Sequence, residues 1–388
     1  MQGATTVSEL TERLPGIEVE TALPEAQPGH WIERAPGKRL MVFSGRSHPE
    51  LAQRIAEQRP GHWIERGPWK RLMVFSGRSH PALAEKISEQ LGVERGEVML
   101  KTFANDETYC RYEESIRGAD VFLVQTGCPP VDKNLMELLL MIQAAKLASA
   151  KRITAVIPWF AYSRQDRKAK PREPISARLV ADMLQLAGVD RVLTMDLHAG
   201  QIQGFFDIPV DHLTALQLFA RHFRDLGLAG EDVVAVAPDA GRAKQTVRFA
   251  EMIDASFAII HKMRPAQEQV EVTGVTGRVR DKRAIIGDDS SMTGSTLIEG
   301  AKALVEHGAK EVNVFVTHAL FSDDALAAIA KCDEIQRIVI TDTVPIDARK
   351  QPSKMAVLSV APLLAEAIMN VFADESVSGI FGGENQLF

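Results

Sequence analysis

Cysteine is scarce in this sequence: its 388 residues include three, Cys110, Cys128 and Cys332, which are widely spaced. An odd number of scattered cysteines argues against a disulfide framework or a zinc site and favours a reducing compartment, so we expect a cytoplasmic protein. No apolar run approaches the roughly 18 residues of a membrane span. The formal net charge of −6 gives no electrostatic reason to expect a nucleic-acid partner, which normally shows as a basic surplus.

Motifs of several common chemistries are also missing. The chain has no G-x-G-x-x-G after a first strand, no G-x-x-x-x-G-K-[ST], no G-x-S-x-G elbow and no paired C-x-x-C. The sequence therefore offers no support for a Rossmann dinucleotide site, a P-loop, an α/β-hydrolase or dithiol chemistry.

The composition, 45% hydrophobic and 25% charged, is that of an ordinary globular protein, and the length predicts two domains. A tandem repeat precedes them: residues 27–58 closely match residues 59–90, and both copies contain PGHWIER and KRLMVFSGRSHP. A solenoid needs about three copies to bury its faces. We therefore interpret residues 1–69 as an extension that holds the first copy, and the rest of the second copy as the start of the core.

From Leu72 onward, apolar runs alternate with helical patterns, which predicts parallel sheets with right-handed crossovers. Asn134 is the expected N-cap of one helix. Strands are expected at 72–76, 121–125, 153–159, 191–195, 233–237, 257–260, 284–286, 312–317, 338–341 and 355–359, and helices at 81–91, 135–148, 177–187, 214–226 and 297–307. We assign residues 70–212 and 213–360 to two α/β domains, and 361–388 to a C-terminal helix and tail that pack on the first.

Ligands of such sheets bind beyond the carboxyl ends of the strands, so residues that follow strands are the functional candidates. Asp288 and Asp289 follow one strand and lead into a small-residue loop, 293–296, and a helix. Free N–H groups at a helix start bind anions, and the acids suit sugar hydroxyls or a metal. The alternative is an ordinary turn, which is rich in the same residue types.

Three other strand ends carry charged residues. The basic loop 162–174 is either a solvated surface loop or an arginine clamp for a polyphosphate. Asp196 and His198, two residues apart, suit a divalent ion or a phosphate, although a lone Asp-x-His is more often structural. Lys262 and Arg264 have the character of a mobile cationic flap that neutralises charge on a transferring phosphoryl group.

These segments, in this order, resemble the ribose-phosphate pyrophosphokinases (phosphoribosyl pyrophosphate synthetases) over about residues 70–388. The resemblance rests on DLHAGQIQGFFDIPVD from Asp196, SRQDRK from Ser163 and NLMELL from Asn134, and on TDTVP, LSVAPLL and ESVS further on. It implies two tandem type I phosphoribosyltransferase-like domains with parallel sheets, commonly assembled as hexamers. The implied reaction transfers the diphosphoryl group of ATP to the C1 hydroxyl of ribose 5-phosphate. Mg²⁺ is the implied cofactor, inorganic phosphate the implied activator, and ADP a further common effector.

The resemblance also implies roles for individual positions. It places the nucleotide at Phe103, Asn105, Asp106, Glu107, Arg164 and Gln165, and Mg²⁺ at His198 and Asp239 with Asp196 beside them. It places ribose 5-phosphate at Asp288, Asp289, Met292, Thr293, Gly294, Ser295 and Thr296, and the catalytic loop at Lys262 and Arg264. Arg117, Ser376 and Ser378 fall near the anion effector site.

The chain departs from the family pattern at a few of these positions. Asn105 replaces a carboxylate at the nucleotide ribose, and Met263 replaces the middle cation of the flap. Met292 replaces an acid thought to engage the sugar, and Ser295 replaces a glycine beside the phosphate. A lost hydrogen bond to a charged group costs roughly 1.5–3 kcal/mol, or about one to two decades in rate.

The leading hypothesis is therefore an active diphosphokinase. The altered phosphate loop and the duplicated N-terminal segment favour an alternative, a catalytically impaired paralogue that regulates an active synthetase by co-assembly. A phosphoribosyltransferase that consumes the product is a third reading, against which the basic loop and the complete first domain argue.

Overall fold

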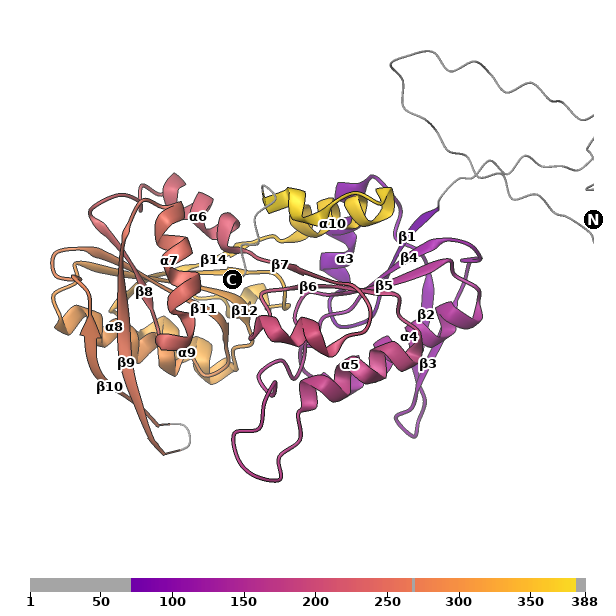
Figure 1. The fold of residues 1–388 in the computed structure, drawn as a ribbon, viewed down its shortest axis with the longest axis horizontal. Helices are drawn as coiled ribbons and strands as arrows, with labels where there is room; N and C mark the ends of the chain where they lie inside the picture. The colour runs from indigo at the N-terminus through magenta and orange to yellow at the C-terminus, as the bar shows by residue number, and fades with distance from the viewer. Residues whose placement is uncertain (1–70, 267–268, 382–388) are drawn as a thin grey trace, which may run out of the picture. The chain divides into compact units, whose positions relative to one another are not determined.

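Residues 71–266 and 269–381 are described by the structure, a computed structural model, and they belong to the unit Lys70–Phe388 (Figure 1). The first repeat copy lies outside the described residues, as do the start of the second copy and the last residues of the tail. The expected α/β fold with parallel sheets is confirmed. Within the described ranges, no helix is long and apolar enough to cross a membrane.

The first sheet has five parallel strands in the order β1-β4-β5-β6-β7. Successive side chains of a strand point to opposite faces, and here both faces are covered. Met73 and Phe75 pack with helices α4 and α5, whereas Val74 packs on the other face with α3 and α10. The bounds are β1 Leu72–Ser76, α3 Pro81–Leu91, β4 Asp120–Val124, α4 Val131–Leu147, β5 Arg152–Ile157, α5 Ser176–Ala187, β6 Arg191–Met195 and β7 Val210–Leu213. Burial on both faces explains the continuous apolar runs in the sequence.

The second sheet has seven strands in the order β10-β9-β8-β11-β12-β13-β14, parallel except for the antiparallel β9–β10 hairpin. Helices α8 and α9 cover one face, and α6 and α7 pack with the large core cluster on the other. The bounds are α6 Leu216–Asp225, β8 Val233–Ala237, α7 Ala243–Met252, β9 Ser256–Ala266, β10 Gln269–Thr276, β11 Arg283–Ser291, α8 Ser295–Glu306, β12 Glu311–Ala319, α9 Asp323–Lys331, β13 Ile335–Thr341, β14 Met355–Leu358 and α10 Ala361–Ala373.

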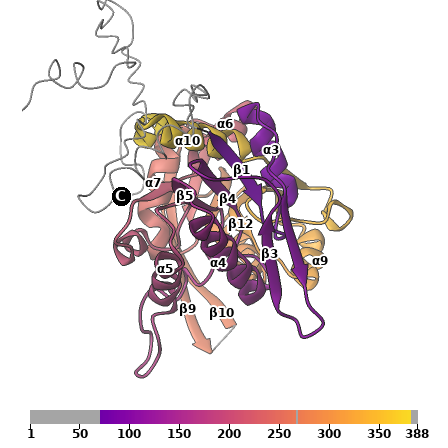
Figure 2. The ribbon, with the colours of Figure 1, turned by 90° about the vertical axis from the view of Figure 1, so that its right-hand side faces the viewer.

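One apolar cluster joins the two sheets. It contains Val74 and Phe122 of the first sheet, Val233 and Phe315 of the second, and the buried face of α10. Figures 1 and 2 both show α10 beside α3, so the C-terminal helix of the chain lies against the first helix described. The residue limits of the expected domains stay a prediction.

Several expected elements have different limits in the structure. Helix α4 begins at Val131, so Asn134 lies inside it, where its amide donates to the Cys128 carbonyl at 2.8 Å and caps nothing. Strand β9 runs to Ala266, so the expected flap is the arm of a hairpin and does not follow a strand. Strand β11 runs to Ser291, because hydrogen bonds to β12 continue past the apolar run. The hairpin of β2 (Val98–Thr102) and β3 (Thr108–Tyr112) was not expected.

Four phenylalanines pack together beneath the second sheet: Phe219, Phe223, Phe249 and Phe315. The Phe249 and Phe315 ring centroids lie 4.7 Å apart, and those of Phe219 and Phe315 lie 4.5 Å apart. Gly287 leaves room for this cluster, since a Cβ there would lie 2.1 Å from the Phe315 ring. The cluster fixes helix α7 on the sheet and therefore the loop that enters α7.

We predict that Phe249→Ala lowers the free energy of unfolding by about 3–5 kcal/mol, because it opens a cavity at a fully buried ring. Val247→Ala, at an exposed position of the same helix, is expected to change it by less than about 0.5 kcal/mol. Urea unfolding of the two variants and the parent protein measures both values. Equal losses for the two variants would contradict the assignment of Phe249 to the core.

Candidate functional site

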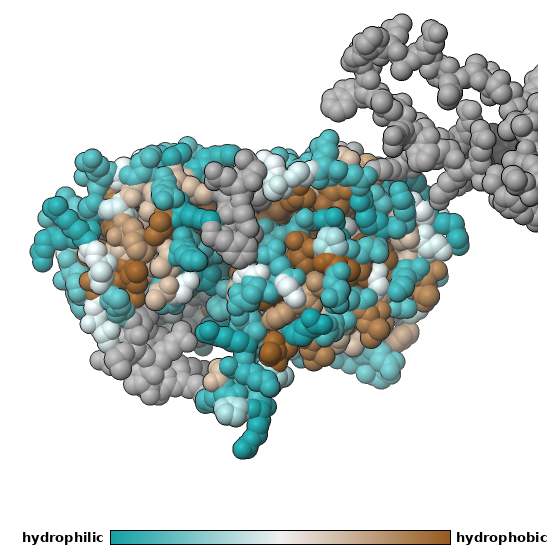
Figure 3. All heavy atoms as spheres, viewed as in Figure 1, coloured by the Kyte–Doolittle hydropathy of each residue, from teal (hydrophilic) through white to brown (hydrophobic). Residues whose placement is uncertain are grey.

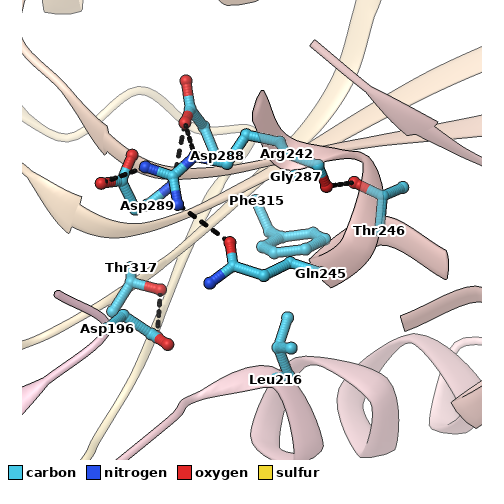
Figure 4. A pocket seen from close by; sticks show the side chains of 10 residues that line it. All are labelled: Asp196, Leu216, Arg242, Gln245, Thr246, Gly287, Asp288, Asp289, Phe315 and Thr317. Atoms are coloured by element: carbon cyan, nitrogen blue, oxygen red, sulfur yellow. Dashed lines mark hydrogen bonds and ion pairs between the residues drawn. The ribbon is translucent and has the colours of Figure 1, made fainter. Parts of the chain in front are cut away.

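Side chains from three strand ends meet in one charged cluster. His198 follows β6 of the first sheet, Asp288 and Asp289 lie near the end of β11 of the second, and Arg242 lies in the short 3-10 helix Ala240–Arg242 that follows β8. Figure 4 shows Arg242 between the two carboxylates, above Gln245 of α7. The parallel strands of the second sheet bring β8 and β11 side by side, which places their carboxyl ends together.

Hydrogen bonds hold this cluster tightly. The Arg242 Nη2 group donates to Asp289 Oδ2, and its Nε lies 3.5 Å from Asp288 Oδ1. His198 Nδ1 lies 2.9 Å from the same Asp289 oxygen and 3.0 Å from Arg242 Nη2. Arg242 was missed in the sequence, because an arginine one residue after a glycine in a turn carries no signal of burial.

Burial and charge move the pKa values of the two acids in opposite directions. Burial raises the pKa of Asp288, and the neighbouring Asp289 charge raises it further. Burial also opposes ionisation of Asp289, but the hydrogen bond from His198 and the positive charge of Arg242 outweigh it, so the Asp289 pKa lies well below its usual value. The surroundings therefore favour ionisation of Asp289 over ionisation of Asp288.

Asp196 is placed differently from its neighbour His198. It is 4% exposed, and its Oδ2 accepts hydrogen bonds from the Ala215 amide at 3.0 Å and from Thr317 Oγ1 at 2.8 Å. Thr317 belongs to β12, so this bond links the end of the first sheet to the second. The carboxylate holds the start of α6 and the end of β12, whereas His198 is about one-third exposed.

His318 of β12 makes a second link between the sheets. Its Nε2 lies 3.0 Å from the Met195 carbonyl, its Nδ1 lies 3.0 Å from Thr343 Oγ1, and its ring packs on Trp159 with centroids 4.7 Å apart. Burial lowers the His318 pKa despite nearby carboxylates. Because a carbonyl can only accept, His318 Nε2 donates to the strand-end carbonyl of β6, which fixes the residues that lead to His198.

The expected phosphate loop forms the start of helix α8. Gly294 has a φ of +71° and precedes the first helical residue, Ser295. The Thr293 and Ser295 hydroxyl oxygens lie 2.9 Å apart; Thr293 is exposed and Ser295 is half-buried. Met292 has 52% of its surface exposed, while its carbonyl accepts from the Ser322 amide at 3.2 Å. Thr296 follows in the first turn of the helix, so an anion here would face hydroxyls and a helix N-terminus.

The basic loop before α5 reaches this phosphate loop. Arg164 Nη1 lies 3.5 Å from Met292 Sδ, and the neighbouring Gln165 accepts from Ser176 Oγ at 2.7 Å. Figures 1 and 2 both show the loop and the β9–β10 hairpin projecting at the same end of the molecule. Lys262 and Arg264 lie in β9 of that hairpin.

The other expected nucleotide residues lie at the tip of the β2–β3 hairpin. Phe103 is half exposed and packs edge-on against Tyr109, with centroids 5.9 Å apart. Asp106 accepts from Lys133 Nζ at 2.7 Å, and the Asn105 carboxamide accepts from the Glu107 amide at 3.4 Å. Among the described residues, no hydrogen bond or ion pair joins this tip to Arg164 or to the His198 cluster.

The expected effector residues lie at two places. Ser376 and Ser378 have hydroxyl oxygens 2.8 Å apart, just after α10. Arg117 is exposed on the turn before β4. No described contact joins Arg117 to the two serines.

The donor set fits a magnesium ion that is held mainly by substrate. No group of three or more His, Cys, Asp or Glu side chains within the described ranges is arranged to bind a metal. Mg²⁺ normally keeps waters and binds one or two protein ligands plus phosphate oxygens. Asp239 and His198 are both partly exposed, and Asp239 Oδ1 accepts from the Gly241 amide at 2.9 Å. Asp196, with its buried oxygen already engaged, is the weaker candidate.

The fold and the site define an α/β protein whose charged centre lies where the carboxyl ends of parallel strands meet. A model of the N-terminal domain of ribose phosphate pyrophosphokinase matches residues 72–188, and a model of the phosphoribosyl synthetase-associated domain matches residues 264–382.

Relatives match nearly the whole chain. The ribose-phosphate pyrophosphokinase of Clostridium acetobutylicum is 48% identical over 90% of this chain and 99% of its own. The chloroplastic ribose-phosphate pyrophosphokinase 2 of Arabidopsis thaliana is 44% identical over 95% of this chain and 85% of its own. The crystal structure of phosphoribosylpyrophosphate synthetase from Mycobacterium smegmatis aligns with a TM-score of 0.73 and 43% identity, over 79% of this chain and 100% of that chain. This chain belongs to the ribose-phosphate pyrophosphokinase family, and its α/β fold with parallel sheets is shared with that crystal structure.

We predict that Thr317→Val lowers the free energy of unfolding by about 1–3 kcal/mol, because the buried Asp196 carboxylate loses its hydroxyl donor. Thr317→Ser keeps the hydroxyl and serves as the matched control, with a smaller loss for one methyl group. Chemical denaturation of both variants tests the link. A Thr317→Val protein as stable as Thr317→Ser would show that the bond is unimportant.

Proposed function

We propose that this protein is a ribose-phosphate diphosphokinase. It transfers the diphosphoryl group of ATP to the C1 hydroxyl of D-ribose 5-phosphate and yields AMP and 5-phospho-α-D-ribose 1-diphosphate for nucleotide biosynthesis. Family membership and identity over nearly the full length of its relatives support this activity. The alternative, an impaired regulatory paralogue, has no comparable support.

The observation that carries the proposal is the approach of Arg164 to Met292. The first residue lies in the basic loop proposed for ATP, and the second borders the loop proposed for ribose 5-phosphate. The two substrates would therefore meet between these loops, beside the His198 cluster. Phosphoryl transfer depends mainly on such positioning and on charge neutralisation.

The site residues take complementary roles in this proposal. Phe103, Asn105, Asp106, Glu107, Arg164 and Gln165 bind the nucleotide, and Asp288, Asp289 and residues 292–296 bind ribose 5-phosphate. The helix α8 N-terminus and the Thr293 and Ser295 hydroxyls hold the 5-phosphate. His198 and Asp239, with Asp196 behind them, hold Mg²⁺, which when bound neutralises the polyphosphate charge.

The chemical step is an in-line displacement at the β-phosphorus of ATP. The C1 hydroxyl oxygen forms a bond to this phosphorus and releases its proton to solvent, while the bond to the oxygen bridging the α- and β-phosphorus breaks and AMP leaves. Negative charge spreads over the transferring group and the leaving oxygen. Lys262 and Arg264 of the β9–β10 hairpin supply positive charge to these oxygens.

Regulation and assembly follow the family in this proposal. Arg117, Ser376 and Ser378 bind an anionic effector, and inorganic phosphate is the proposed activator. The protein assembles with copies of itself, as a hexamer, in the cytoplasm. Three exposed leucines of α4 and α5 support association: Leu147, Leu179 and Leu186. Figure 3 shows hydrophobic surface, in brown, over these two helices, and exposed apolar patches are typical of protein interfaces.

We predict AMP formation from ATP, Mg²⁺ and ribose 5-phosphate, and at least a roughly hundredfold fall of kcat in Lys262→Ala, because its charge acts chiefly in the transition state. Lys302→Ala removes an exposed lysine of α8 and is expected to retain activity. Absence of turnover by folded protein in phosphate would reject the enzyme and favour the regulatory paralogue.

We predict that Met292→Asp raises kcat/KM for ribose 5-phosphate by roughly 10–100-fold, because it restores a charged hydrogen-bond partner worth about 1.5–3 kcal/mol. The backbone at this position is already held by Ser322, so the change affects the exposed side chain. Met292→Leu, an apolar replacement of similar size, is expected to change nothing. Steady-state kinetics with ribose 5-phosphate varied decide the matter, and equal values for Asp and Leu would contradict the role of this position.

A further inference from the structure

Arg242 is the one member of the charged cluster to which neither the motifs nor the proposed reaction gives a role. It is 8% exposed, and arginine is almost never buried unless it is paired. Its guanidinium contacts Asp289, Asp288 and Gln245, so three different N–H groups have acceptors. Such a fork fixes the direction of a carboxylate as well as balancing its charge.

The carboxylate that Arg242 holds also contacts an imidazole from the other sheet. Asp289 Oδ2 lies 2.9 Å from His198 Nδ1, and Arg242 Nη2 lies 3.0 Å from that same nitrogen. A single Nδ1 atom cannot both donate to Asp289 and accept from Arg242. The carboxylate can only accept and the guanidinium already donates to it, so we assign the proton to Nδ1 and the hydrogen bond to Asp289. The lone pair of His198 then resides on Nε2.

We propose that Arg242 is a positioning residue that acts through Asp289 on His198. It locks the Asp289 carboxylate, which holds the imidazole in the tautomer and orientation that present Nε2 to the divalent ion on the polyphosphate. Metal-binding histidines commonly donate their second nitrogen to a carboxylate, and such outer partners strengthen the metal site. This inference rests on the proposed function only for the role of His198 as a metal ligand.

The location of Arg242 makes this role specific. It precedes α7, whose Phe249 is fixed in the aromatic cluster, and its carbonyl accepts from Thr246 Oγ1 at 2.9 Å. Asp289 belongs to β11 of the second sheet, whereas His198 follows β6 of the first. Arg242 and Asp289, which belong to the second sheet, therefore fix the orientation of His198, the proposed metal ligand from the first sheet. Loss of the guanidinium would leave Asp289 without its buried partner and His198 without a fixed acceptor.

The test is the affinity of the protein for Mn²⁺ with a non-hydrolysable ATP analogue, measured by electron paramagnetic resonance without ribose 5-phosphate. We predict that Arg242→Gln weakens Mn²⁺ binding by roughly 10–100-fold, the usual effect of removing an outer partner of a metal ligand. Arg242→Lys keeps the charge but lacks the fork, so an intermediate loss is expected. Arg221→Gln removes an exposed arginine of α6 and is the charge control, with unchanged binding.

A double-mutant cycle separates positioning from a general structural effect. In a His198→Ala background, Arg242→Gln and Arg242→Lys are expected to cause almost no further loss of Mn²⁺ affinity, because the residue through which they act is gone. Circular dichroism verifies folding, and the lysine variant alone completes the cycle if the glutamine variant does not fold. Unchanged Mn²⁺ affinity in the single variants, or an undiminished loss without His198, would overturn the proposal. Failure of the parent protein to form AMP would reject the diphosphokinase, and the Mn²⁺ measurement would still decide the role of Arg242.

Discussion

A buried carboxylate, Asp289, sets the constraint on which the rest of the site depends. Removing an ionised acid from water is costly unless charge and hydrogen bonds replace the solvent. Here Arg242 and His198 supply them, one from the turn after β8 and the other from the loop after β6. The acid can therefore stay ionised only while both sheets keep their places. The burial of Asp289, a proposed sugar-binding acid, thus ties its position to that of His198, a proposed metal ligand.

The two sheets are joined by a second set of buried polar contacts close to this cluster. Asp196 binds Thr317, and His318 binds the Met195 carbonyl, so the last residues of β6 are held by β12. The shared apolar cluster, which includes α10, also joins the sheets, but apolar packing is non-directional. The hydrogen bonds add direction, and they lie where His198 leaves the sheet. A reaction that depends on aligning two substrates would benefit from this rigidity.

The fold could be predicted well from periodicity, and the failures have physical reasons. Strands buried on both faces give continuous apolar runs, so β4, β5, β6 and β8 were expected near their observed places. The β2–β3 hairpin lacks such a run because its residues are half-buried or exposed. Strands β9 and β11 extend past their apolar residues because backbone hydrogen bonds to neighbouring strands, which no side-chain pattern records, continue into polar sequence. The expected N-cap at Asn134 was wrong because the helix already begins at Val131. The Asn134 side chain instead donates to the Cys128 carbonyl, in the loop before the helix.

By itself, the sequence determined the α/β class, the family and the segments that carry the chemistry, because these depend on local periodicity and on motifs that are contiguous along the chain. Asp288 and Asp289 were candidates from the start for that reason. Tertiary structure alone decided that the pKa values of the two acids shift in opposite directions, that Asp196 is bound by Thr317, and that Arg242 joins the centre. Burial and partners from distant strands produce these properties. Such contacts, unlike an apolar run or a glycine-rich turn, leave no pattern in the order of residues.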